Sequence, residues 1–140
     1  MPTTPRLHLL VVEDDPSIQL LLRRLLQAHF AVHVVADATQ ALEAARQRTF
    51  DLFLLDINLG EGRDGVELLA ALRRMPGQAE APAVACTAYA LPQDRERFLS
   101  AGFDAFVGKP FTRRHLLAAL GRFHPEVLPP GPPRRRPTPA

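Results

Sequence analysis

Polar side chains follow four of the apolar runs in this sequence, and their types could do chemistry together. In chain order they are Glu13, Asp14, Asp56, Thr87 and Lys109. If the runs are parallel strands of one sheet, their carboxyl ends meet at one edge and bring these side chains together. Carboxylates gathered there repel one another and need a compensating cation. Mg²⁺ takes oxygen ligands of this kind, so the residues favour a magnesium site.

The same residues favour phosphoryl transfer to a carboxylate. The sequence shows no serine paired with a histidine as in hydrolases, and no glycine-rich phosphate loop. Asp56 would attack a phosphorus atom while the metal and Lys109 neutralise the surrounding oxygens. Lys109 is the single lysine beside sixteen arginines. A lysine suits this role because its ammonium group is a compact point charge.

The elements that must position these residues alternate between apolar runs and helical patterns. Expected strands cover 7–12, 32–35, 52–55, 83–86 and 105–107. Expected helices cover 16–29, 39–48, 65–74, 92–101 and 112–123. Strands that are apolar on both faces and alternate with helices indicate an α/β fold. We expect a doubly wound parallel sheet with helices on each side.

Composition fits one domain of 140 residues that can bury a core. No apolar run approaches the roughly 18 residues needed to span a bilayer. The first six residues contain no apolar signal core, so we do not expect secretion. The single cysteine, Cys86, fits a reducing compartment. We therefore expect a cytoplasmic protein.

The last residues differ in composition from the rest of the chain. The segment 124–140 is rich in proline and arginine, so we expect a flexible tail behind a folded domain over 6–123. Residues 126–140 hold three of the 17 basic residues and one of the 15 acidic ones, which leaves fourteen of each in 1–125. This balance gives no reason to expect direct binding of nucleic acid.

Four segments together resemble the motifs of the response regulator receiver family, and the resemblance covers about residues 6–123. The segments are 11–15, 54–59, 87–88 and 109–111. The resemblance implies a flavodoxin-like sheet of five parallel strands in the order 2-1-3-4-5, with five helices. It also implies a two-component phosphorylation switch that promotes only its own phosphorylation and dephosphorylation.

The resemblance implies partners as well. A histidine kinase or a histidine phosphotransfer protein would donate the phosphoryl group. The output would be binding to a downstream protein or onward phosphorelay, by a monomer or a weak dimer.

For the acidic residues, the resemblance implies that Asp56 is the phosphorylation site. Asp14, Asp56 and the backbone carbonyl of Asn58 would bind Mg²⁺ directly, with Mn²⁺ as a possible substitute. Glu13 would hold the metal through a water molecule.

For the remaining site residues, the resemblance implies contacts to the phosphoryl group from Thr87, the backbone amide of Ala88, and Lys109. Phe106 would swing inward when Thr87 moves. The peptide bond before Pro110 would be cis, an isomer that proline permits at modest cost.

Two features lie outside the motifs. Leu20, Leu21 and Leu22 are successive, and three successive residues span about 200° of a helix, so a one-sided helix cannot bury them all. The resemblance implies that the first helix docks the phosphodonor, so we hypothesise that Leu20 and Leu21 form the contact. The loop after Asp56 also departs from the family pattern. Gly60 replaces the usual proline and Gly65 comes one position later, so we expect a longer, more flexible loop.

Two alternatives stay open at this point. A receiver that serves only as a scaffold would not accept phosphate, although all the acidic residues are present. An aspartate-based phosphatase of the same architecture carries a D-x-D pattern at its nucleophile. Here position 58 is Asn, so no second carboxylate is present to act as acid or base. A flavin-binding module fits less well, because no Ser/Thr/Gly-rich loop follows the first strand.

Overall fold

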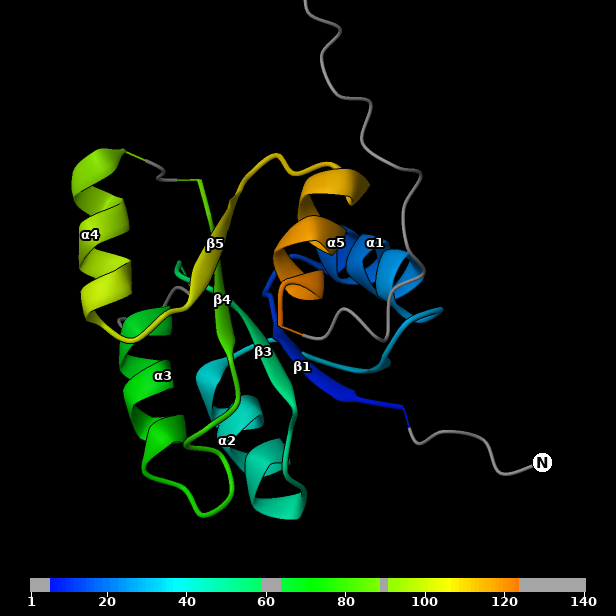
Figure 1. Cartoon of the computed structure of the whole chain (residues 1–140). Coiled ribbons are helices and arrows are strands. Elements are labelled where there is room, and N and C mark those ends of the chain that lie inside the picture. The colour runs from blue at the N-terminus through cyan, green and yellow to red at the C-terminus, as the bar shows by residue number, and fades with distance from the viewer. Residues whose placement is uncertain (1–5, 59–63, 89–90, 124–140) are drawn as a thin grey trace, which may run out of the picture.

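The computed structural model describes residues 6–58, 64–88 and 91–123, so the predicted tail 124–140 and the loop residues 59–63 lie outside the described residues. In these described residues, five strands alternate with five helices (Figure 1). The strands are β1 His8–Val12, β2 Ala31–Val35, β3 Leu52–Asp56, β4 Ala83–Thr87 and β5 Ala105–Gly108. The helices are α1 Pro16–Leu26, α2 Ala38–Gln47, α3 Gly65–Arg73, α4 Pro92–Ser100 and α5 Arg113–Gly121.

The strands form one parallel sheet in the order β2-β1-β3-β4-β5, which confirms the predicted doubly wound fold. Helices α1 and α5 cover one face, and α2, α3 and α4 cover the other (Figure 1). Leu22 and Leu116 pack into the core between the sheet and helices α1 and α5. Leu69 and Phe98 pack into the core on the opposite face. Every residue of β3 and β4 is buried, which explains why these strands are apolar without alternation.

Side chains just before the helices determine where four of them begin. Asp15 precedes Pro16, and its Oδ1 accepts hydrogen bonds from the backbone N–H groups of Ser17 and Ile18. The residues that cap α2, α3 and α5 in the same way are Asp37, Asp64 and Thr112. Each satisfies a donor that the first turn of a helix leaves unpaired. None of the described helices is long and apolar enough to cross a membrane.

The strand register brings the ends of four strands to one edge of the sheet. The residue pairs at this edge are Val12 with Leu55, Asp56 with Cys86, and Thr87 with Gly108. Glu13 follows the end of β1 and Lys109 follows the end of β5, so both reach the same edge. This edge lies at the carboxyl ends of the strands, where doubly wound folds hold their ligands.

Helix α1 ends at Leu26, three residues before the predicted end at 29. The backbone N–H groups of His29 and Phe30 both donate to the carbonyl of Leu26, which closes a tight turn. Phe30 is buried in the core between α1 and the sheet. Burial of this ring turns the chain into β2 and ends the helix, a tertiary effect that the local pattern does not contain.

Candidate functional site

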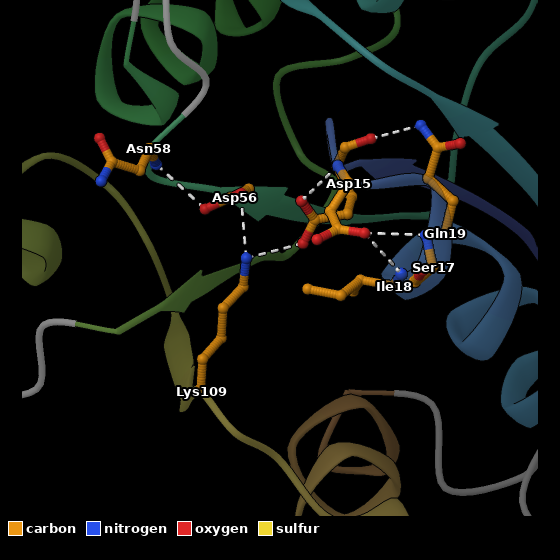
Figure 2. A network of polar contacts seen from close by, with 8 residues as sticks. Asp15, Ser17, Ile18, Gln19, Asp56, Asn58 and Lys109 are labelled. Carbon is orange, nitrogen blue, oxygen red and sulfur yellow. Dashed lines mark hydrogen bonds and ion pairs between the residues drawn. The ribbon is translucent and has the colours of Figure 1, made fainter.

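The ammonium group of Lys109 joins two buried carboxylates at the strand-end edge. Its Nζ donates to Oε1 of Glu13 at 2.7 Å and to Oδ2 of Asp56 at 3.0 Å (Figure 2). Glu13 is 1% exposed and Asp56 is 3% exposed, so water contributes little to the stability of either charge. Burial alone would lower the pKa of Lys109, but the hydrogen bonds and charges of the two acids outweigh it and raise the pKa above its usual range. The ammonium therefore stays charged.

Asp56 is held on both sides of its carboxylate. Its Oδ2 accepts from Lys109, and its Oδ1 accepts from the backbone N–H of Asn58 at 3.0 Å (Figure 2). The backbone N–H of Ile57 donates to the carbonyl of Cys86 and thereby continues the pairing of β3 with β4 beyond Asp56. The carboxylate is thus placed by a sheet position and two hydrogen bonds. A carboxylate fixed in this way can present an oxygen to an electrophile with little reorganisation.

Asp14 completes a group of three acids. One carboxylate oxygen from each of Glu13, Asp14 and Asp56 lies within 4.8 Å of the others. Asp14 is exposed, unlike the other two acids. Desolvation, a hydrogen bond with Glu13 and the charge of Glu13 raise the pKa of Asp14. The group therefore carries more negative charge than Lys109 alone balances, and its oxygen donors fit a hard divalent cation such as Mg²⁺.

Glu13 has protein partners at both of its carboxylate oxygens. Oε1 accepts from Lys109, and Oε2 accepts from the backbone N–H of Asp15 at 3.2 Å. The side-chain amide of Gln19 also donates to the Glu13 carbonyl (Figure 2). The sequence identified the acid but not these contacts, which hold it beside Lys109.

The other predicted site residues lie around the same edge. Thr87 is buried at the end of β4, and its carbonyl accepts from the backbone N–H of Lys109 at 2.8 Å. Ala88 follows it and is exposed. The peptide bond between Lys109 and Pro110 is cis, the isomer that the resemblance implies. Phe106 lies on β5 and is half-buried, with the guanidinium of Arg95 at 4.6 Å from its ring centre.

Two further predicted residues lie apart from the acids. Leu20 and Leu21 on α1 are 50% and 45% exposed, whereas the next residue, Leu22, is buried. The pattern of three successive leucines predicted that they could not all be buried, and two of the three are exposed.

Gly65 is a site residue whose contact the sequence did not reveal. It begins α3, and its backbone N–H donates to the carbonyl of Ile57 at 2.9 Å. A Cβ atom at Gly65 would lie 2.5 Å from the carbonyl oxygen of Asp56. Only glycine therefore permits α3 to begin this close to Asp56. The sequence signal was the position of a glycine at the start of a helical pattern, but the neighbour across the loop could not be inferred from it.

Comparison with known proteins identifies the family to which a chain with this site belongs. Residues 9–121 match the response regulator receiver domain family. The chain belongs to this family. It is 34% identical over 124 residues to an uncharacterized 14.6 kDa protein of Leptolyngbya boryana, an alignment that covers 88% of this chain and 94% of that protein.

Solved structures support the assignment to the receiver family. Chemotaxis protein CheY4 of Vibrio cholerae is similar with a TM-score of 0.80 and 28% identity, over 85% of this chain and 99% of that one. The receiver domain of the sensor histidine kinase PA1611 of Pseudomonas aeruginosa is similar with a TM-score of 0.75 and 33% identity, over 85% and 98% of the two chains. That structure is described as holding a magnesium ion in its active site cleft.

Several curated relatives are much longer than this receiver. The match spans 13% of a histidine-protein kinase of Escherichia coli and 36% of a transcriptional activator of Pseudomonas aeruginosa. Receivers of this family therefore occur both within kinases and within transcription regulators. The matched part corresponds to the receiver unit, and the activities of the longer relatives do not transfer with it.

We expect Gly65→Ala to lower the free energy of unfolding by about 1–3 kcal/mol, because the added methyl group forces α3 away from Asp56. Mg²⁺ affinity should fall in the same variant. Gly108→Ala is the matched control, since a Cβ atom there meets nothing within 4 Å. Urea denaturation measures the effect, and equal midpoints for the two variants would show that the close approach carries no strain.

We expect Lys109→Met to lower the free energy of unfolding at pH 7 by about 3 kcal/mol, because it leaves Glu13 and Asp56 buried without a cation. Arg46→Met removes the cation of an exposed pair and serves as control. Urea denaturation at pH 7 tests this, and equal midpoints for Lys109→Met and Arg46→Met would contradict it.

Proposed function

We propose that Asp56 of this receiver accepts a phosphoryl group from a phosphohistidine donor in a Mg²⁺-dependent reaction. The observation that carries the proposal is the position of Asp56, whose Oδ2 lies 3.0 Å from Lys109 Nζ inside the group of three acids. A carboxylate beside a fixed ammonium is suited to an acceptor role, because the transferred group brings oxygens that need neutralisation. The receiver acts as a switch and promotes only its own phosphorylation and dephosphorylation.

The transfer itself needs few protein groups. A carboxylate oxygen of Asp56 forms the new bond to phosphorus, while the bond from phosphorus to the donor nitrogen breaks and its electron pair stays on the imidazole. The residues that would hold Mg²⁺, or Mn²⁺ as a substitute, are Asp14, Asp56 and the backbone carbonyl of Asn58, with Glu13 acting through water. A cation held by these residues would neutralise charge on the transferred group.

Lys109 supports the transferred group from its position beside Asp56. Its ammonium already contacts Asp56, so it can follow the new oxygens with a small movement. Glu13 keeps the second contact to the ammonium and thereby limits how far Lys109 moves. The Thr87 hydroxyl and the Ala88 amide complete the contacts to the phosphoryl oxygens.

The switch follows from the charge of the new group. A phosphoryl group adds about −1.5 to −2 charge and strong acceptor oxygens. Thr87 and Lys109 move toward it, and Phe106 on β5 turns inward as Thr87 moves. Phosphorylation thereby favours one of two pre-existing states of the α4 and β5 surface.

The partners follow from the same chemistry. The donor is a histidine kinase or a histidine phosphotransfer protein, and the presence of receivers in histidine kinases among the relatives supports this. The output is binding to a downstream protein or onward phosphorelay, by a monomer or a weak dimer in the cytoplasm. We do not assign direct contact with nucleic acid, because residues 1–125 carry fourteen basic and fourteen acidic residues.

We expect a small phosphodonor with Mg²⁺ to add one phosphoryl group to the wild-type protein. The Asp56→Asn variant should receive no phosphoryl group. Asp51→Asn is the matched control, because Asp51 lies just before the opposite end of β3 and its carboxylate accepts from the backbone of His8. Intact mass measures the result. Labelling of Asp56→Asn, or no labelling of the wild type, contradicts the acceptor role and favours the scaffold alternative. Steady turnover of a free phosphomonoester favours the phosphatase alternative.

The exposed leucines of α1 support a docking role for this helix. Leu20 and Leu21 expose large apolar side chains, whereas Leu22 and Leu26 fill the core beneath them. Helix α1 begins just after Glu13 and Asp14, so a donor seated on it brings its phosphohistidine near Asp56. We therefore assign Leu20 and Leu21 to the donor interface.

We expect Leu20→Glu to slow transfer from a phosphohistidine protein by at least about tenfold, which corresponds to about 1.4 kcal/mol of lost interface energy. Labelling by a small phosphodonor should keep its wild-type rate, since the side chain is 50% exposed and lies outside the acid group. Leu99→Glu is the matched control because Leu99 on α4 is 51% exposed. Equal transfer rates for the two variants, measured at equal folded fraction, would remove α1 from the interface.

A further inference from the structure

An ion pair joins α4 to the loop that follows the phosphoacceptor. Arg97 NH2 on α4 donates to Oδ2 of Asp64 at 3.2 Å. Asp64 is the residue just before α3, and it pairs with Asn58 through an isolated antiparallel bridge. The pair therefore connects α4, by one side chain, to the segment that places the Asn58 carbonyl.

The two carboxylate oxygens of Asp64 accept hydrogen bonds from two different helices. Oδ1 accepts from the backbone N–H of Glu67 at 2.9 Å and caps α3, while Oδ2 accepts from Arg97. The loop between Asn58 and Asp64 thus ends on a residue that is anchored to α3 by its cap and to α4 by its charge. Loss of the Arg97 contact leaves the cap in place but removes the anchor to α4.

We infer that Arg97 is a positioning residue for the Mg²⁺ site, and that the position of α4 and the binding of Mg²⁺ are coupled through the Arg97–Asp64 pair. The inference rests on the proposed function, because it assumes that the Asn58 carbonyl is a metal ligand. When Arg97 holds Asp64, the bridge to Asn58 keeps this carbonyl in place for the metal. Because coupling is reciprocal, bound Mg²⁺ also favours the position of α4 in which the pair forms.

This connection is separate from the one through Thr87 and Phe106. Arg95, two residues before Arg97, stacks on Phe106 of β5 at 4.6 Å. Residues two apart on a helix point about 200° apart, so the two arginines leave α4 in opposite directions. Helix α4 therefore contacts the phosphoacceptor loop with one arginine and β5 with the other.

The coupling is modest in size. The side chains of Arg97 and Asp64 are 59% and 33% exposed, so solvent screens the pair. Exposed ion pairs of this kind change an equilibrium by roughly two- to fivefold. We expect a change of that order in the Mg²⁺ dissociation constant.

The test is the Mg²⁺ dissociation constant of the unphosphorylated protein, read from the NMR shift of the Asn58 amide. Arg97→Gln should bind Mg²⁺ roughly two- to fivefold more weakly than the wild type. Simple electrostatics predicts the opposite sign, because removal of a positive charge near an acidic site strengthens cation binding. Arg46→Gln is the control for charge, since Arg46 forms a comparable exposed pair with Glu43 on α2.

A second variant separates the pair from the cap. Asn caps helices about as well as Asp, so Asp64→Asn keeps the start of α3 and removes only the charge that Arg97 contacts. In that background, Arg97→Gln should cause no further weakening. If Arg97→Gln weakens Mg²⁺ binding equally in the wild-type and Asp64→Asn backgrounds, the coupling is overturned. It is also overturned if Arg97→Gln binds Mg²⁺ as tightly as Arg46→Gln or more tightly. If the wild type itself fails to bind Mg²⁺, the proposed function fails first.

Discussion

Electrostatic crowding at one edge of the sheet is the constraint on which the rest of this receiver depends. Three carboxylates place oxygens within 4.8 Å of one another, and one ammonium contacts two of them. Such a cluster costs free energy unless its charge is balanced, because like charges in a poorly solvated site repel one another. Lys109 balances part of it. The remaining imbalance makes the site receptive to a divalent cation and, with that cation, to a phosphoryl group.

The fold holds this cluster together against its own repulsion. The parallel sheet places Glu13 after β1, Asp56 at the end of β3 and Lys109 after β5, all at the same edge. Their backbones cannot separate without breaking the sheet. Gly65 lets α3 begin against Asp56, and the cap of α3 places Asp64 beside Asn58. Packing in two cores on either side of the sheet therefore holds the charged residues together despite their repulsion. Function and stability oppose each other at this edge, as is common at functional sites.

Most of the fold could be predicted from the sequence because its signals are local. Continuous apolar runs marked the strands, and the expected start of the first helix at residue 16 is also the start of α1. The end of α1 was predicted three residues too late, because it depends on the burial of Phe30 against distant residues. In the site, residue types at the strand ends predicted which side chains meet. The contact of Arg97 with Asp64 could not be predicted, since the two exposed residues are 33 positions apart and no periodic pattern relates them.

Mg²⁺-dependent phosphorylation of Asp56 is best tested by chemical location of the phosphoryl group. The wild-type protein is incubated with a small phosphodonor and Mg²⁺, the acyl phosphate is reduced with borohydride, and the modified residue is located by peptide mass spectrometry. Reduction converts an aspartyl phosphate to homoserine, so our account predicts homoserine at position 56 when Mg²⁺ is present and unmodified Asp56 when the metal is chelated. Homoserine at Asp14 or at another carboxylate, or equal modification of Asp56 without the metal, would contradict it.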